Sequence, residues 1–378
     1  MNANSKQGQS TLPSSSHSSN GPDSTSNGSP IDPAFLDKVQ RLFSENSSDF
    51  RTTLIKEMLT GIVKLHEMDV DILDIKILHR AFKELRHAFG VFQPYAHIRK
   101  VSIFGSARTP PEDPNFQLAV RFGRLLSENE YMVITGAGEG IMWAGHEGAG
   151  KEHSFGVNIM LPFETTANPV ILDDPKLVHL KYFFTRKLLF VRQSHATALF
   201  PGGFGTLDEG YELLTLIQTG KANPVPIVCL HAPGSGYWDR WLEFNRKELL
   251  PRKLICEADL SLFKVFENEH DAFEEIQQFY RNYHSIRFIG DKFLIRLQDS
   301  LTDTQLQHVN TEFRDLIVDG DITQCGPFPE EVDEPELASL TRLVFHYTRR
   351  DAGRLRQLID YLNAAPVDHS ALPQVSSA

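Results

Sequence analysis

The chain has 378 residues, of which 41% are hydrophobic and 23% are charged, proportions that are typical of a globular protein with a substantial core. Its formal net charge of −11 argues against a surface dedicated to nucleic acid or to anionic membranes, so neither is an expected partner. The three cysteines have no metal-ligand spacing and form no even disulfide framework, and no stretch is apolar enough for a membrane helix. We therefore expect a cytoplasmic protein without a metal site.

The first 97 residues fall into two predicted segments. Residues 1–32 are rich in Ser, Asn, Gly and Pro and are predicted to be a disordered tail. A serine-rich start also occurs in organelle transit peptides, but these are rich in arginine and the first arginine here is Arg41. Residues 33–97 carry apolar side chains at helical spacing and are predicted to form a helical extension. Such stripes favour burial, as structural cover or as a dimer face, over a regulatory role.

From residue 98 to residue 284 the pattern alternates between strands and helices. Strands are predicted at 101–104, 131–135, 155–161, 197–200, 226–230 and 262–266. Regular alternation of this kind predicts an α/β fold with a Rossmann-like, doubly wound parallel sheet. The loops that follow the strands are expected to meet at one edge of the sheet, where ligands bind in such folds.

The C-terminal part is predicted to be a small α/β domain at 285–366, followed by a frayed tail at 367–378. A helix at 271–283 is expected to close the preceding domain. Within the small domain we predict strands at 294–297 and 340–347 and helices at 302–316 and 351–362. No catalytic pattern is found in this part of the sequence.

The most informative stretch runs from Ala196 to Glu209. Strand-prone residues lead into Pro-Gly-Gly-Phe-Gly-Thr, and a helical pattern follows. Glycines let a ligand approach the backbone, and the free N–H groups at a helix N-terminus favour an anion such as phosphate. Glu209 is predicted to lie beside that anion site. Alternatively, Thr206 and Glu209 form a capping box, although a plain cap does not need the preceding glycines.

Two more loops and one basic pair are expected at the same site. The loops at 105–108 and 136–140 follow strands, as the loop at 201–206 does, so all three are predicted to share one pocket. Arg186 and Lys187 are predicted at the start of a helix, where cations are disfavoured. This position favours a functional role, in which the guanidinium of Arg186 reaches a ribose or phosphate oxygen.

The stretch Pro201–Glu209 resembles the PGGxGTxxE signature of the LOG ("Lonely guy") family, nucleotide 5′-monophosphate phosphoribohydrolases that are often mislabelled lysine decarboxylases. Residues 105–108 resemble the first loop of that family, 136–142 its GGGxxGLM loop, and 185–187 its "RK" helix start. The resemblance implies an N-glycosyl hydrolase of the AMP nucleosidase type that needs no cofactor. It would cleave AMP or a cytokinin riboside monophosphate to the free base and ribose 5-phosphate.

The resemblance also implies the site residues. The catalytic positions of the family correspond to Glu209 and Arg186, while the division of roles between Glu209 and Glu212, which share a helix face, is left open. The expected substrate-binding residues are Gly202, Gly203, Gly205 and Thr206, whose backbone N–H groups would hold the phosphate, together with Ser106, Arg108, Gly136, Gly138, Gly140, Lys187 and Glu212. Family members build each active site near a subunit contact, so a homodimer or larger assembly is expected.

The sequence departs from the family pattern at two positions and leaves one alternative function. Ala137 replaces the middle glycine of GGG, and Trp143 stands where the family usually has Gly, so Trp143 could narrow the base site or pack beneath it. The glycine spacing in 136–140 also differs from the dinucleotide fingerprint GxGxxG. No lysine is set up to hold a decarboxylase cofactor. The alternative is a non-catalytic nucleotide or cofactor carrier, which needs the phosphate cradle but not Glu209.

Overall fold

The computed structural model describes residues 32–44, 49–160 and 167–365. The predicted tails at 1–32 and 367–378 therefore lie, apart from Asp32, outside the described residues. The chain divides into two compact units, one up to Ile75 and one from Lys76 onwards. Among the described residues, no helix combines the length and the apolar character needed to cross a lipid bilayer.

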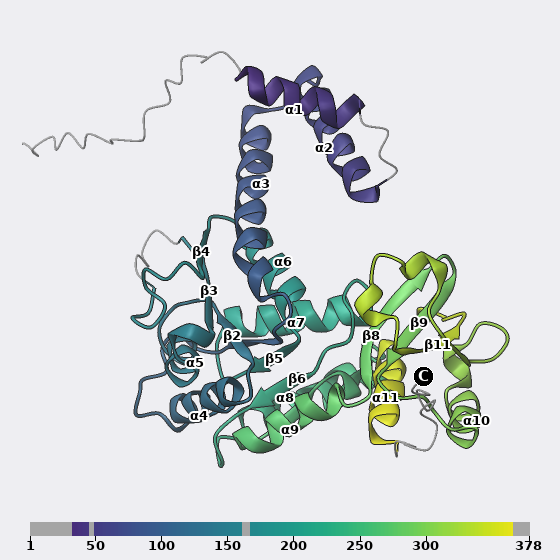
Figure 1. Ribbon diagram of the computed structural model, residues 1–378. Helices are drawn as coiled ribbons and strands as arrows, with labels where there is room; N and C mark the ends of the chain where they lie inside the picture. Colours follow the sequence, from purple (N-terminus) through teal and green to yellow (C-terminus); the bar gives the residue numbers. More distant parts are fainter. Residues whose placement is uncertain (1–31, 45–48, 161–166, 366–378) are drawn as a thin grey trace, which may run out of the picture. The chain divides into compact units, whose positions relative to one another are not determined.

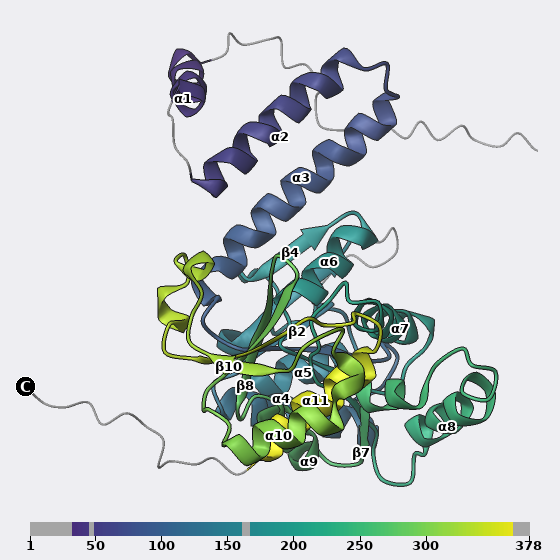
Figure 2. The same ribbon diagram turned by 90° about the vertical axis from the view of Figure 1, so that its right-hand side faces the viewer.

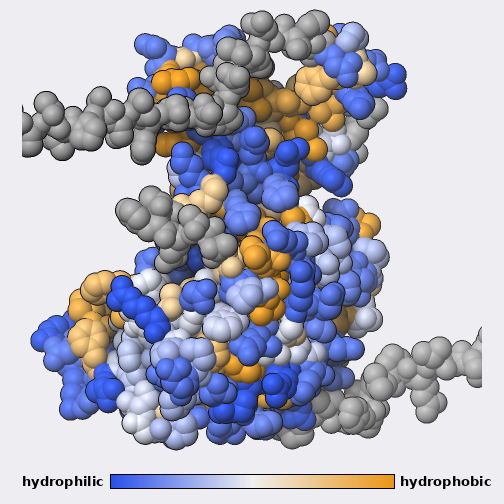
Figure 3. Space-filling view, turned by 90° about the vertical axis from the view of Figure 1, so that its left-hand side faces the viewer, coloured by the Kyte–Doolittle hydropathy of each residue, from blue (hydrophilic) through white to orange (hydrophobic). Residues whose placement is uncertain are grey.

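The first unit contains α1 (Pro33–Ser44), α2 (Phe50–Glu67) and the start of α3 (Ile72–Phe92). Asp49 caps α2, because its carboxylate accepts the backbone N–H groups of Arg51 and Thr52. Within the described part of the chain, no residue of α1 or α2 is buried. Figure 3 shows hydrophobic side chains on the outside of these helices. The predicted helical stripes are therefore present but leave their apolar faces exposed.

The second unit contains a seven-stranded sheet with the order β4-β3-β2-β1-β5-β6-β7. Every neighbouring pair in it is parallel. The strands are β1 (Lys100–Phe104), β2 (Met132–Thr135), β3 (Ser154–Ile159), β4 (Leu177–Leu180), β5 (Ala196–Leu199), β6 (Ile227–Leu230) and β7 (Lys264–Phe266). The predicted Rossmann-like parallel sheet is confirmed, with β4 as an additional strand at one edge.

Helices cover both faces of this sheet (Figure 1). They are α4 (Pro114–Glu128), α5 (Ile141–Ala149), α6 (Phe183–Gln193), α7 (Phe204–Gln218), α8 (Tyr237–Phe244) and α9 (Glu269–Phe279). Successive strand residues point to opposite faces, so Ile103 packs in the core formed with α4, α5 and α9, whereas Phe104 packs in the core with α3, α6, α7 and α8. Short 3₁₀ turns span Gln93–Tyr95, Lys151–His153 and Glu257–Leu262, and a π-helical turn, Asn245–Leu249, continues α8.

The strand order reverses between β1 and β5. The chain first adds β2, β3 and β4 on one side of β1, and then places β5, β6 and β7 on the other side. Loops leaving β1 and β5 therefore diverge, and this is where doubly wound sheets form ligand crevices. The two loops stay connected at their base, because the N–H of Ser106 donates to the carbonyl of Pro201 at 3.1 Å.

A second sheet of four antiparallel strands, in the order β10-β11-β9-β8, forms the C-terminal part of this unit. Its strands are β8 (Tyr283–Ile289), β9 (Lys292–Leu297), β10 (Thr323–Cys325) and β11 (Thr341–Phe345). Figure 2 shows α10 (Asp303–Glu312) and α11 (Ala352–Ala364) beside it, and side chains of both helices enter one core with the sheet. Short 3₁₀ turns lie at Arg314–Leu316, Pro329–Glu331 and Pro335–Leu337.

One helix boundary predicted for this region is wrong, and two strands were not predicted. The helix expected at 271–283 ends at Phe279, and Tyr283 already begins β8. Neither β8 nor β10 was predicted. Both strands are defined by pairing with distant partners, β8 with β9 and β10 with β11, and such pairing is not visible in local periodicity.

Candidate functional site

A pocket with a volume of about 810 Å³ opens at the carboxyl ends of β1, β2, β3 and β5. The predicted site residues that line it are Ser106, Arg108, Gly136, Gly138, Arg186, Gly202, Gly203, Gly205, Thr206 and Glu209. Within the described residues, Gly140, Lys187 and Glu212 were also predicted for this site but do not form part of the pocket wall. The three expected loops therefore do share one pocket.

The glycine-rich loop after β5 forms the N-terminus of α7. Gly203 is the N-cap and Phe204 the first helical residue, so Thr206 lies inside the first turn and the capping-box alternative is wrong. The N–H of Thr206 donates to the carbonyl of Gly203 at 3.1 Å, whereas those of Gly203, Phe204 and Gly205 donate to no other backbone group in the described chain. These N–H groups at a positive helix end suit an anion.

Gly202 has a packing role in this loop. A Cβ at this position would lie 2.1 Å from Oγ1 of Thr206 and 3.0 Å from the backbone nitrogen of Ser106. Only glycine fits this close approach, so Gly202 lets the loops after β1 and β5 lie against each other. The hydroxyl of Tyr237 also donates to the carbonyl of Gly202, at 2.7 Å.

The loop after β2 lies against Arg186. A Cβ at Gly136 would lie 2.1 Å from Nη2 of Arg186, so this glycine leaves room for the guanidinium group. Gly140 has φ +62° and packs against the carbonyl of Ser106, which gives it a structural role beneath the first loop. Ala137 also has a positive φ, 62°, so the middle position of the family's GGG keeps here the backbone conformation that favours glycine.

Arg186 and Lys187 lie in the first two turns of α6 and point to different partners. Nε of Arg186 donates to the carbonyl of Val157 at 3.0 Å. Nζ of Lys187 instead contacts three carboxylates of α7, at 2.9 Å from Asp208, 3.4 Å from Glu209 and 2.7 Å from Glu212. Arg186 is thus part of the pocket wall, while Lys187 neutralises the acidic face of α7.

Glu209 is the shielded carboxylate of this group, because its side chain is 10% exposed whereas those of Glu212 and Asp208 are 30% and 62% exposed. Burial raises the pKa of Glu209, and the positive charges of Lys187 and Arg186 offset only part of that effect. Glu209 lines the pocket and Glu212 does not. The structure thus separates two carboxylates that are equivalent in the sequence.

A buried polar network supports the loop after β2. Asn168 donates its backbone N–H to the carbonyl of Ala137 at 2.8 Å, and its side-chain amide to that of Gly138 at 3.1 Å. His146 contacts the side chains of Asn168 and Thr135 and the carbonyl of Phe155. The loop is therefore held by a network that contains a fully buried imidazole.

This network predicts acid sensitivity. Burial lowers the pKa of His146 from 6.5 to about 4. The neutral ring therefore stabilises the fold fully above pH 6.5, and this contribution is lost as the pH falls towards 4. Between pH 7 and pH 5, we expect protonation of His146 to lower the free energy of unfolding by about 2 kcal/mol, since one pKa unit corresponds to about 1.4 kcal/mol. Urea unfolding of wild type and His146→Gln at both pH values measures this loss, and equal pH dependence of the two proteins would contradict it.

Trp143 does not reach the pocket. Its ring packs edge-on against Phe116, with the ring centroids 5.5 Å apart, at the border of the core formed with α4, α5 and α9. Among the described residues, Trp143 is absent from the pocket wall. The structure therefore shows a packing role for Trp143, against α4, and no contact with the pocket.

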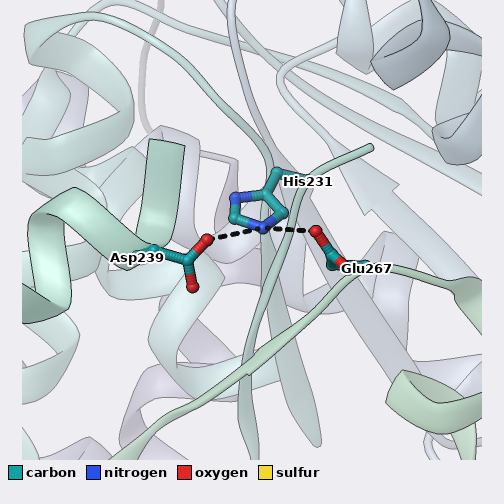
Figure 4. Close-up of side chains that lie close together, drawn as sticks. All are labelled: His231, Asp239 and Glu267. Carbon is teal, nitrogen blue, oxygen red and sulfur yellow. Dashed lines mark ion pairs between the residues drawn. The ribbon is translucent and has the colours of Figure 1, made fainter. Parts of the chain in front are cut away.

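A separate cluster of His231, Asp239 and Glu267 has the composition of a metal site (Figure 4). Nε2 of His231 is buried without a hydrogen-bond partner among the described residues, 3.4 Å from Asp239 and 3.7 Å from Glu267. However, Nδ1 of His231 accepts the backbone N–H of Trp238 at 3.0 Å. In the neutral ring the proton therefore lies on Nε2, which then points an N–H, not a lone pair, at the carboxylates. This arrangement caps α8 and does not offer a nitrogen ligand to a metal.

Several pocket residues were not among the predicted site residues, although Gly105, Ala107 and Phe204 lie in loops that were predicted to share the pocket. The unpredicted residues are Phe104, Gly105, Ala107, Met142, Asn158, Ile159, Phe183, Phe204, Leu207 and Asp208. Asn158 follows the same rule as the predicted loops, because it lies near the carboxyl end of a parallel strand. Phe204 is 94% exposed and belongs to the glycine motif itself. Phe183 gave no signal, because the start of α6 was placed near Arg186, three residues too late.

A family of known proteins resembles the part of the chain that contains α6 and α7. Residues 139–276 match a family model. It is described as "Possible lysine decarboxylase", the label often given to LOG proteins, so the chain contains a LOG-like domain over these residues. The match includes α6 and the loop into α7 but begins after Gly138. No curated protein matches the sequence.

Several solved structures resemble about half of the chain. The molybdenum cofactor carrier protein from Chlamydomonas reinhardtii is 15% identical, over 48% of this chain and 97% of that one, with a TM-score of 0.34. The molybdenum cofactor binding protein from Rippkaea orientalis is 18% identical, over 48% and 94%, with a TM-score of 0.33. DNA processing protein A from Helicobacter pylori is 15% identical, over 47% and 79%, with a TM-score of 0.32.

Proposed function

We propose that this protein hydrolyses the N-glycosidic bond of nucleoside 5′-monophosphates, releasing the base and ribose 5-phosphate. The observation that carries the proposal is the position of Glu209. Its shielded carboxylate lines the same pocket as Arg186 and the N–H groups at the start of α7. This combination places a proton-transferring group beside an anion site.

In this proposal the phosphate binds at the N-terminus of α7. The backbone N–H groups of Gly203, Phe204 and Gly205 hold its oxygens, and the positive end of the helix favours its charge. Arg186 reaches a ribose or phosphate oxygen from the opposite wall through its guanidinium group. Fixing the phosphate in this way orients C1′ of the ribose towards Glu209.

Cleavage then breaks the bond between C1′ and the base nitrogen, and its electron pair leaves with the base. Positive charge develops on the ribose, which the carboxylate of Glu209 stabilises, as carboxylates do in glycosidases. A water oxygen forms the new bond to C1′, and Glu209 accepts the proton that this water loses. Glu209 then gives this proton up, and the departing base takes one up, directly from Glu209 or through solvent, so atoms and charge balance and the carboxylate is restored. The raised pKa of Glu209 suits a group that accepts a proton near neutral pH.

The substrate is proposed from the LOG resemblance as AMP or a cytokinin riboside monophosphate. Incubating the purified protein with AMP and following adenine by HPLC tests this, with a panel of other monophosphates in parallel. We expect release of free base together with ribose 5-phosphate. If no monophosphate yields a base, although AMP binds, hydrolysis is excluded.

A carrier of a nucleotide or related cofactor is the second candidate. It is favoured by one contact, because Nζ of Lys187 lies 3.4 Å from the carboxylate of Glu209 and makes this carboxylate a weaker proton acceptor. A carrier needs the anion site alone. The same HPLC assay, combined with calorimetric titration of AMP, separates tight binding without turnover from catalysis.

We also propose that the protein forms a homodimer or larger assembly through α1 and α2. Their apolar side chains include Phe50, Met58 and Ile62, which are 72%, 51% and 56% exposed, and such exposed patches mark interaction surfaces. Light scattering should give at least twice the mass of one chain. A Met58→Glu, Ile62→Glu double variant is expected to yield monomers, whereas Lys64→Glu in the same helix is expected to leave the assembly intact. A monomeric wild type would contradict this proposal.

A further inference from the structure

Glu84 is a buried carboxylate in a helix that is otherwise largely exposed. The residue is 5% exposed, and it lies in α3, whose other buried residues are Ala88 and Phe92. Removing a carboxylate from water is costly unless it is paired and hydrogen-bonded. The hydrogen-bond partners of Glu84 therefore indicate its structural role.

Two of the partners lie at the start of α6, about one hundred residues along the chain. Glu84 accepts the backbone N–H of Lys181 at 2.7 Å and the hydroxyl of Thr185 at 2.8 Å. Arg80, one turn earlier in α3, donates its Nε at 2.7 Å. Burial alone raises the pKa of Glu84, but these hydrogen bonds outweigh it and lower the pKa below its ordinary value, so the carboxylate is charged at neutral pH.

Glu84 places a carboxylate at the start of α6, whose own first turn has no acidic residue. The N-cap of α6 is Tyr182, which makes no side-chain capping bond within the described chain. A carboxylate at this end complements the positive end of the helix dipole, and the N–H that it accepts belongs to Lys181, one residue before the N-cap. It also offsets the unfavourable placement of two cations, Arg186 and Lys187, in the first turns of the same helix.

Arg186 directly follows Thr185, which Glu84 holds through its hydroxyl. The guanidinium of Arg186 has little freedom, because it lies against Gly136 and its Nε donates to the carbonyl of Val157. The backbone of Arg186 belongs to the first turn of α6, so a shift at the start of α6 would disturb the bond to Val157 and displace the guanidinium. A displacement of about 1 Å in a substrate-positioning group can lower the rate of the reaction by roughly 10²-fold.

We propose that Glu84 is a positioning residue, which sets the N-terminus of α6 and thereby places Arg186 in the pocket. It touches no substrate and acts only through α6. This inference rests on the proposed function for the role of Arg186 as a nucleotide-binding group.

A double-mutant cycle between Glu84→Gln and Arg186→Lys tests the proposal. AMP affinity is measured by calorimetry, and kcat and KM by adenine release. We expect Glu84→Gln alone to weaken AMP binding and lower kcat about tenfold, which corresponds to about 1.4 kcal/mol. In the Arg186→Lys protein, Glu84→Gln should alter AMP affinity and kcat less than twofold, because the guanidinium that Glu84 positions is already replaced.

Glu275→Gln is the matched control. Glu275 is also a shielded carboxylate that pairs with two cations, Lys264 and Arg356, but it lies in α9 outside the pocket wall. We expect a loss of stability in urea similar to that of Glu84→Gln, with unchanged AMP affinity and kcat. Glu84→Asp should restore part of the lost affinity, since it retains the charge.

The outcomes separate the two proposals. Equal effects of Glu84→Gln in the wild-type and Arg186→Lys backgrounds would overturn the positioning role even if AMP is hydrolysed. If AMP binds, and Glu84→Gln weakens its binding in wild type but not in the Arg186→Lys protein, the positioning role is supported. If adenine is not released in the same experiments, hydrolysis is excluded. A wild-type protein that does not bind AMP overturns both.

Discussion

Glu209→Gln is expected to lower the rate of adenine release from AMP by about 10²–10⁴-fold, the usual contribution of a positioned proton-transfer group. Gln has the shape of Glu but neither its negative charge nor its ability to accept a proton. It can therefore neither stabilise positive charge on the ribose nor activate the attacking water. The loss should appear in kcat, and the AMP dissociation constant should change little, because the phosphate is held by the start of α7.

The fold of this variant should be intact. Gly203, not Thr206, caps α7, so Glu209 is not part of a capping box whose loss would unfold the first turn. Burial already disfavours the charge of Glu209, and a neutral side chain there is expected to leave the free energy of unfolding unchanged or slightly increased. Glu248→Gln, an exposed surface change, is the charge control. An active Glu209→Gln protein, or one whose inactivity follows unfolding in circular dichroism, would contradict the proposed role.

Glu331→Gln is expected to cost about 3–5 kcal/mol of stability, as breaking a buried ion pair usually does. The side chain of Glu331 is 1% exposed and lies between Arg296 and Arg342, themselves 3% and 0% exposed. Its carboxylate accepts Nε of Arg296 at 2.8 Å and Nε of Arg342 at 3.1 Å. Gln would leave the guanidinium of Arg342 without a counter-charge among the described residues and would leave that of Arg296 with Glu334 as its remaining carboxylate.

The pKa of Glu331 supports this magnitude. Burial raises the pKa, but hydrogen bonds from Arg342, the backbone N–H of Phe328 and Arg296 reverse this and hold it at about 2. The depressed value means that the stabilisation is present above pH 4.5 and is lost as the pH falls towards 2. Urea unfolding at pH 7 measures the cost, with the neighbouring exposed Glu330→Gln expected to stay within about 0.5 kcal/mol of wild type. Similar losses in both variants would show that the buried pairing is not the cause.

Much of the parallel sheet was predictable because its signals are local. Runs of apolar residues such as Val101–Phe104 and Ala196–Leu199 are buried on both faces in β1 and β5, and glycines follow such strands where the backbone must turn sharply. Parallel strands separated by helices leave few topologies open. That restriction is why the loops at 105–108, 136–140 and 201–206 could be placed at one edge without knowing the strand order.

The sequence did not predict which of the charged residues face the pocket and which pair with one another. Glu209 and Glu212 are three residues apart on one helix face, and only the packing of α6 against α7 shields the first and pairs the second with Lys187. Lys187 was expected at the substrate because it adjoins Arg186 in the sequence. On a helix, adjacent residues point about 100° apart, so the two side chains face different surroundings.

The sequence by itself determined the βα architecture, the glycine loops and the acidic residue that follows them, since these depend on periodicity and on backbone freedom within a few residues. Only the tertiary structure decided where α7 begins, which carboxylate enters the pocket, and that β8 and β10 exist. It alone brought Glu84 to the start of α6, because hydrogen bonds between residues about one hundred positions apart depend on how the whole chain packs. Local pattern records whether a side chain is buried, and packing determines what it is buried against.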